Sequence, residues 1–300
     1  MSIAIAGVTI GDPMSYRAIT VFPLYTTESR PVDYDYAEDA VKRGNVLIEE
    51  VGESGTVPNI IVDNAGETRV LFLEGEELRG AKQNRVLNTT VLVAARTKTL
   101  VPVSCVERGR WRYTSKHFEP SMSMSPSKLR KTLKTTVTKS LLMHAGHRSD
   151  QHAIWDEVEK THALFHLESP TEALSDTFEH LKDVLADCCS RFAYADGATG
   201  LAIGVGSRIV SFDLFDKPET CRRFWQRIIA SCALDALDVP PEKTAVQKSD
   251  VEKLVQRINA AKWLKSEAVG EGEEYRFDDN GTQGSALCLG DCPVHVTVIH

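Results

Sequence analysis

The first third of the chain alternates between short apolar runs and polar turns that contain glycine, asparagine or aspartate. Runs of this length, rich in valine, isoleucine and leucine and bounded by turn residues, predict β-strands rather than helices. A break in this pattern, closed by Gly44, predicts one short helix at 35–43. The predicted strands lie at 18–24, 46–51, 58–62, 70–73, 86–93 and 101–107.

In the middle of the chain the spacing of apolar residues changes to that of an α-helix. Apolar positions recur every four residues over 128–144, and a second stripe runs from Ile154 to Phe165. The sequence Ser-Pro-Thr-Glu at 169–172 predicts a capping box for a third helix that buries residues from Leu174 to Cys188. A further helix is predicted to open at Pro218.

The last hundred residues return to strands. A glycine-rich hairpin is predicted at 197–215, followed by a linker at 239–244 and a short helix opened by a capping box at 249–252. A β-meander is predicted at 266–299. These elements give an α+β fold, with a strand-rich N-terminal half packed with helices from the middle of the chain. We expect one domain over 1–240 and a C-terminal subdomain of a helix plus the meander over 241–300.

Composition supports a water-soluble globular protein. Hydrophobic residues make up 42% of the chain and charged residues 26%, and no apolar run is long enough to cross a bilayer. The N-terminus has no basic region of the kind that opens a signal peptide. Seven cysteines without a regular spacing predict reduced thiols in a cytoplasmic protein and no zinc site.

One charged segment, 73–86, stands out between two predicted strands. Loops held by a rigid scaffold often carry binding and catalytic groups, so we interpret this segment as a candidate site. It combines carboxylates, cations and amides within a short stretch. These residues are Glu74, Glu76, Glu77, Arg79, Lys82, Gln83, Asn84 and Arg85.

A second polar segment follows the strand predicted at 101–107. Strand parity puts Arg85 and Glu107 at the charged ends of two apolar faces, where they are expected to pair if the strands are neighbours. Glu107 is followed by Arg110 and Trp111, residue types that bind phosphate and stack on a nucleobase. The alternative interpretation is a set of structural salt bridges inside the protein.

The two segments together suggest roles for their residues. Lys82, Arg85 and Arg110 would bind a substrate's phosphates, and Gln83 and Asn84 its ribose hydroxyls. Trp111 would stack on the base or form a wall of the pocket, and Arg79 is a further substrate-binding candidate. Glu76, Glu77 or Glu107 would transfer a proton or stabilise a developing cation. Paired glutamates also suit Mg²⁺, and the sequence singles out no set of residues as metal ligands.

The block Gly75–Arg85, followed by 102–107 and its continuation into Arg110 and Trp111, resembles the ARG and rhodanese-phosphatase-superfamily-associated protein (ARPP) family. The resemblance spans roughly residues 15–240. The family's name records an association with ADP-ribosylglycohydrolases and rhodanese-type phosphatases. The resemblance therefore implies a role near the metabolism of NAD or ADP-ribose.

These observations leave three functions open. The first is an enzyme or processing factor, a hydrolase or transferase, acting on a nucleotide-sugar anion such as NAD or an ADP-ribose derivative. The second is a non-catalytic module that binds or senses the same small-molecule nucleotide. The third is an RNA-binding protein that uses Arg108–Arg148, a stretch with ten basic residues and one acid. The overall net charge of −7 argues against nucleic acid, and a homo-oligomer remains open.

Overall fold

A computed structural model describes residues 3, 5, 7–27, 31–52, 55–237, 239–240, 245–279 and 281–300. The chain divides into two compact units. The central unit comprises Asp33–Leu181 and Ala268–Gly272, and the terminal unit comprises Met1–Val32, Lys182–Glu267 and Glu273–His300. Both contain helices and strands, so the α+β class predicted from the sequence is confirmed.

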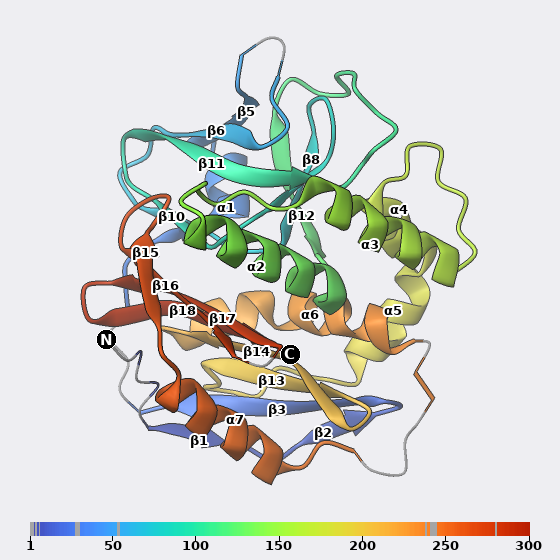
Figure 1. Ribbon diagram of the computed structural model, residues 1–300, viewed down its shortest axis with the longest axis vertical. Helices are drawn as coiled ribbons and strands as arrows, with labels where there is room; N and C mark the ends of the chain where they lie inside the picture. The colour runs from blue at the N-terminus through green and yellow to red at the C-terminus, as the bar shows by residue number, and fades with distance from the viewer. Residues whose placement is uncertain are drawn as a thin grey trace. The chain divides into compact units, whose positions relative to one another are not determined.

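The central unit is built on two sheets (Figure 1), whose strands are antiparallel except that β4 runs parallel to β7. Its larger sheet buries a cluster that includes Ile48, Val62, Leu78 and Val103. The sheet runs in the order β12 (Phe118–Met124), β8 (Glu76–Gly80), β9 (Arg85–Leu87), β11 (Thr97–Cys105), β6 (Asn59–Asn64) and β5 (Val46–Glu50). A smaller sheet joins β10 (Val91–Val93), β7 (Val70–Phe72) and β4 (Asp35–Tyr36), and β4 leads into α1 (Ala37–Lys42).

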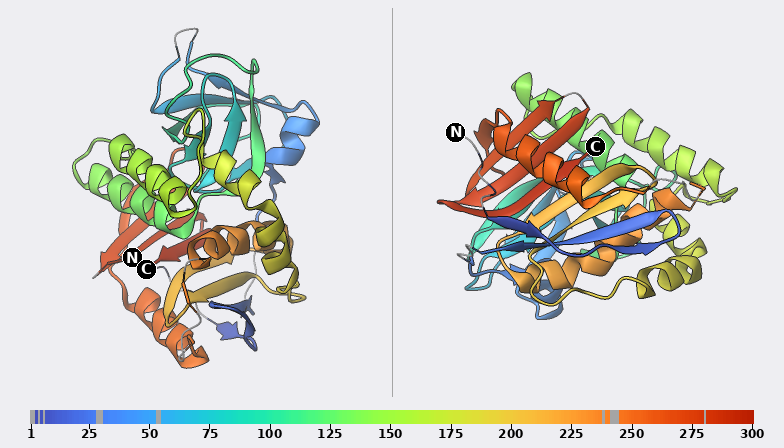
Figure 2. Two further views of the ribbon diagram at one scale, coloured as in Figure 1. Left: turned by 90° about the vertical axis from the view of Figure 1, so that its right-hand side faces the viewer. Right: turned by 90° about the horizontal axis from the view of Figure 1, so that it is seen from below.

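Three further helices complete the central unit: α2 (Ser127–Leu142), α3 (Gln151–Leu164) and α4 (Leu174–His180). Helices α2 and α3 pack against each other, as Figure 2 shows from the side, and α3 also packs on β11. The stripe predicted from the sequence is buried at Leu129, Leu133 and Val137. The helical period therefore identified α2 and the face that it buries.

The terminal unit holds a second antiparallel sheet, which nine of the described strands form. Its order is β1 (Val8–Ile10), β3 (Ile19–Thr26), β13 (Gly200–Val205), β14 (Arg208–Phe215), β18 (Cys292–Ile299), β17 (Thr282–Leu289), β16 (Glu273–Asp279) and β15 (Leu264–Glu267), with β2 (Met14–Tyr16) beside β3. The helices of this unit are α5 (Lys182–Ser190), α6 (Pro218–Ala236) and α7 (Lys248–Ala260). The predicted hairpin is β13–β14, and the predicted meander is β15–β18.

The meander continues the same sheet as the hairpin, because β18 pairs with β14 along Ser211–Phe215. The boundaries of the two compact units therefore differ from those of the expected domains, 1–240 and 241–300. Residues 241–244 of the predicted linker lie outside the described residues.

The strand predicted over 86–93 is in fact two strands in different sheets. Asn88 interrupts it, because its backbone N–H donates to Pro102 O at 3.1 Å and its side chain donates to His147 O at 2.9 Å. The hydroxyl of Ser104 donates to Asn88 Oδ1 at 2.6 Å. These bonds turn the chain, so that β9 pairs with β11 and β10 pairs with β7.

Both predicted capping boxes are displaced. Helix α4 begins only at Leu174, because Glu172 adopts a left-handed φ of 52° and Ser169 Oγ instead accepts from the N–H of Ala173. Helix α7 starts one residue before Ser249, and its capping box joins Gln247 and Asp250. The helix predicted over 174–188 is two helices, since Leu181 ends α4 where the central unit ends.

The cross-strand pair of Gly284 and Phe277 gives a stability prediction. A Cβ on Gly284 would lie 2.1 Å from Phe277 Cε1, and the Phe277 ring is held by an edge-to-face contact with Trp263, with centroids 4.6 Å apart. We expect Gly284→Ala to lower the free energy of unfolding by about 1–3 kcal/mol in urea denaturation. Adding Phe277→Leu should recover part of the loss, and a double variant as unstable as the sum of the single changes would contradict this steric cause.

Candidate functional site

The charged segment forms a β-hairpin rather than the loop predicted from the sequence. Strand β8 leads through a turn at 81–84 into β9, and Ala81 in this turn has a left-handed φ of 41°. Its charged and amide side chains are almost all buried, with Arg79 as the exposed exception. Buried charges need partners, because an unpaired charge inside a protein is strongly unfavourable.

The hairpin and the segment after β11 converge, as the sequence analysis expected. The backbone N–H of Asn84 donates to Glu107 Oε2 at 3.0 Å, and Gln83 Nε2 donates to Glu107 O at 2.9 Å. Strands β9 and β11 are neighbours, with Arg85 opposite Cys105. The two polar segments therefore belong to one hydrogen-bonded network in the central unit.

Arg110 holds this network together by hydrogen bonds from all three nitrogens of its guanidinium. Its Nε and Nη2 bind the Glu107 carboxylate in bidentate fashion at 2.7 and 2.6 Å. Its Nη1 donates to Ala81 O at 2.7 Å and to Arg112 O at 3.0 Å, and Nη2 also donates to Asn84 Oδ1 at 3.2 Å. Protein acceptors thus face every nitrogen of the guanidinium, which is 6% exposed and has no hydrogen left for a phosphate.

The expected pair between Arg85 and Glu107 does not form. Arg85 Nη1 donates to Gln83 Oε1 at 2.7 Å, and its Nη2 lies 3.8 Å from Glu50 Oε1. The reason is that Arg110 already occupies the Glu107 carboxylate from the other side. The Nε of Arg85 has no hydrogen-bond partner among the described residues, although the side chain is fully buried.

The three glutamates on the hairpin have different surroundings. Glu74 pairs with Lys134 of α2 at 2.7 Å, and both side chains are fully buried. Glu76 accepts from the backbone N–H of Leu73 at 2.6 Å. Glu77 accepts from Arg79 Nε at 2.9 Å and Ser121 Oγ at 3.1 Å, while its Oε1 has no hydrogen-bond partner among the described residues.

Burial raises the pKa of Glu77 above the ordinary 4.5 of a glutamate, and the neighbouring Arg79 opposes this shift only in part. Desolvation disfavours the charged carboxylate, so Glu77 keeps its proton at a higher pH than an exposed glutamate. A raised pKa of this kind is typical of general acids, although buried structural carboxylates show it too.

Trp111 and Tyr113 form an aromatic wall beside the hairpin. Both rings are about half exposed, and Lys82 Nζ lies 5.4 Å from the centroid of Trp111 and 5.1 Å from that of Tyr113. Arg85 lies 5.7 Å from the Trp111 centroid. The hairpin therefore presents its cations to two rings that solvent can reach.

An open pocket of about 650 Å³ adjoins this wall. Tyr113 and Glu50 line it, with Glu49, Gly52, Ile61 and residues 114–116. Glu50 is 7% exposed, its Oε1 accepts from the backbone N–H of Lys82 at 3.3 Å, and its Oε2 has no hydrogen-bond partner among the described residues. The sequence analysis missed Glu50, although its even spacing from Val46 and Ile48 places a carboxylate on the core-facing side of β5.

The basic stretch Arg108–Arg148 does not form one basic surface. Arg110, Arg130 and Lys134 are buried, and Lys134 neutralises Glu74. Within the described ranges, no group of three or more histidine, cysteine, aspartate or glutamate side chains is placed to hold a metal ion. No helix in the described part of the chain is long and apolar enough to span a membrane.

The raised pKa of Glu77 predicts a pH-dependent stability. Ionised Glu77 destabilises the folded state above its raised pKa, and this penalty disappears as the pH falls and the carboxyl is protonated. We expect Glu77→Gln to raise the free energy of unfolding by on the order of 1 kcal/mol at about pH 7.5, with a smaller gain at about pH 5. Urea denaturation at the two pH values tests this, and a variant that is less stable at both would contradict it.

Comparison with known proteins identifies a protein family. The family model of the ARG and Rhodanese-Phosphatase-superfamily-associated Protein domain matches residues 7–299, beyond the range over which the sequence motifs suggested the resemblance. No curated protein and no solved structure matches the chain significantly. Because the matched region covers nearly the whole chain and both units, the protein belongs to the ARPP family.

Proposed function

We propose that the central unit binds a phosphate-bearing nucleotide sugar, an ADP-ribose derivative or NAD, in the pocket beside Trp111 and Tyr113. The observation that carries this proposal is the position of Lys82, whose ammonium lies over two half-exposed aromatic rings, one of which, Tyr113, lines an open pocket. Such a ligand combines an aromatic base with a diphosphate, and these are the groups that rings and cations bind.

Each part of the ligand has a matching group in this arrangement. Trp111 or Tyr113 would stack on the base, and Lys82 would contact a phosphate that approaches over the rings. Glu50 would accept a hydrogen bond from a ribose hydroxyl, because a carboxylate is an acceptor and Oε2 has no partner in the described part of the chain. Arg85 supplies positive charge behind the wall rather than direct contact, since it is fully buried.

The roles first assigned to the other candidates shift in this proposal. Arg110, Gln83 and Asn84 hold the turn 81–84 against Glu107 and so position Lys82. Arg79 stays available at the surface but pairs with Glu77. The RNA-binding alternative rested on an exposed basic face at Arg108–Arg148, and three of its basic residues, Arg110, Arg130 and Lys134, are buried.

Calorimetry with ADP-ribose, NAD and AMP tests the proposal. We expect Trp111→Ala and Lys82→Met each to weaken the binding of ADP-ribose at least about fivefold, since a stacked base and a phosphate contact are each worth about 1–3 kcal/mol. Lys98→Met is the matched control. It removes the same charge from the central unit, at an exposed lysine that pairs with Asp63.

Wild-type protein that binds none of the three nucleotides would refute the proposal. Equal affinity in Lys82→Met and Lys98→Met would also refute it, because binding would then not depend on the aromatic wall.

A catalytic version of the proposal rests on Glu77, whose buried carboxyl has the raised pKa of a general acid. The protein would then be a hydrolase or transferase of an ADP-ribose derivative. We expect long incubations, followed by chromatography of the nucleotide products, to show turnover that Glu77→Gln abolishes without weakening binding. Turnover unchanged in this variant would exclude Glu77 as the catalytic residue. An absence of turnover in the wild-type protein would support the non-catalytic binding function instead.

We also propose that the protein is cytoplasmic, which agrees with its seven free cysteines.

A further inference from the structure

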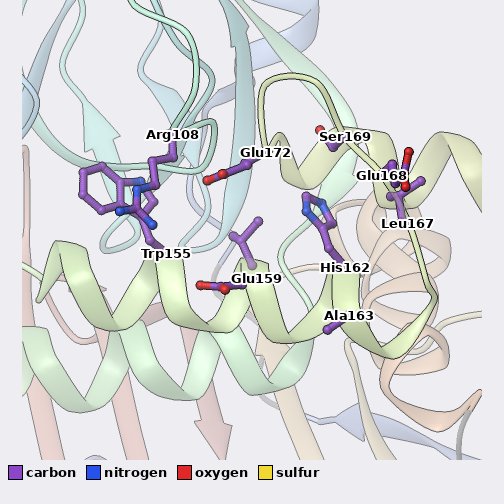
Figure 3. A pocket seen from close by; sticks show the side chains of 10 residues that line it. Arg108, Trp155, Glu159, His162, Ala163, Leu167, Glu168, Ser169 and Glu172 are labelled. Carbon is purple, nitrogen blue, oxygen red and sulfur yellow. The ribbon is translucent and has the colours of Figure 1, made fainter.

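A second pocket in the central unit, of about 420 Å³, opens between α3 and the segment that leads into α4 (Figure 3). Its polar lining is separate from the aromatic wall and plays no part in the proposed nucleotide site. The residues that line it are Arg108, Trp155, Val158, Glu159, His162, Ala163, Leu167, Glu168, Ser169 and Glu172.

Carboxylates dominate this pocket. Glu159 from α3 and Glu172 from the segment before α4 face it from opposite sides, and Glu168 joins them at its edge (Figure 3). None of the three carboxylates makes an ion pair or hydrogen bond with another residue that the structure describes. The one cation of the lining, Arg108, lies over the ring of Trp155 with its Cζ 5.3 Å from the centroid, so negative charge exceeds positive charge.

His162 provides an independent sign that the pocket accepts hydrogen-bond donors. The residue is only 7% exposed, and Figure 3 shows its ring directed into the pocket. Its Nε2 lies 3.1 Å from the carbonyl oxygen of Ala173, which can only accept, so this contact selects the tautomer that carries its proton on Nε2. Nδ1 is then an acceptor, and no described residue donates to it.

Apart from Arg108, which lies over the Trp155 ring, the polar groups that remain available are acceptors, and the walls between them are apolar. A ligand that fits must bring several N–H donors and a positive charge on an aliphatic chain. A metal ion fits less well, because no three of these side chains are placed as its ligands among the described residues.

We propose that this pocket binds an organic cation, a primary ammonium group on an aliphatic chain. The ammonium lies between Glu159 and Glu172 and donates to them and to His162 Nδ1. The chain packs along Trp155, Val158 and Leu167. The same group occurs in free diamines and in lysine side chains of peptides, and the experiment separates these sources.

Calorimetry on the full-length protein with cadaverine and with Nα-acetyl-lysine methylamide is the test, and pentanediol serves as the uncharged analogue. We expect saturable binding of at least one amine and none of pentanediol. The double variant Glu159→Gln with Glu172→Gln should weaken binding at least about tenfold, because it removes two charges that contact the ammonium. Stronger binding of cadaverine indicates a free diamine, and stronger binding of the lysine derivative indicates a peptide.

Two single variants control for other effects. Glu157→Gln removes the same charge from α3 at a residue that pairs with Lys160 outside the pocket, and should leave affinity unchanged. Arg108→Gln removes the only positive charge of the lining and should strengthen amine binding. The proposal is overturned if neither amine binds, if pentanediol binds as well as the amines, or if the double variant binds as well as Glu157→Gln.

Discussion

The bidentate pair of Glu107 and Arg110 is the interaction on which the central unit's polar architecture depends. A buried carboxylate and a buried guanidinium are each costly to remove from water, and only a nearly complete set of hydrogen bonds offsets that cost. Here the remaining donors of Arg110 bind carbonyl groups of the turn 81–84 and of its own loop. One salt bridge thus fixes two segments, and with them the positions of Lys82 and Trp111.

Strand parity predicted that Arg85 and Glu107 pair if their strands are neighbours; β9 and β11 are neighbours, but the two residues have other partners. Strand parity gives the face of the sheet on which a side chain lies, but it does not determine which basic residue pairs with a given carboxylate. Glu107 finds Arg110 three residues away, while Arg85 turns to Gln83 and to Glu50. Pairs such as Glu74 with Lys134 join positions far apart in the chain, so neither spacing nor composition indicated them.

The elements themselves were more predictable than their assembly. Helical periods identified α2 and α3, and short apolar runs between polar turns identified most strands, because both patterns depend on local burial. The break at Asn88 depends on a carbonyl of β11 and on His147, which no local pattern contains. The terminal sheet likewise joins β3 near the start of the chain to β13, and β14 to the last strand, β18, which requires contacts across most of the sequence.

The short segment after β11 contributes side chains to two surroundings of different charge within the central unit. The side chain of Arg108 points toward α3 and lies over the ring of Trp155. The side chain of Arg110 binds the hairpin, and the ring of Trp111 faces Lys82. Three carboxylates and Arg108 line the pocket beside α3, whereas Lys82 and Arg85 lie against the rings of the aromatic wall. Because opposite charges attract, the carboxylates of the α3 pocket favour a cation there, and Lys82 and Arg85 favour an anion at the aromatic wall.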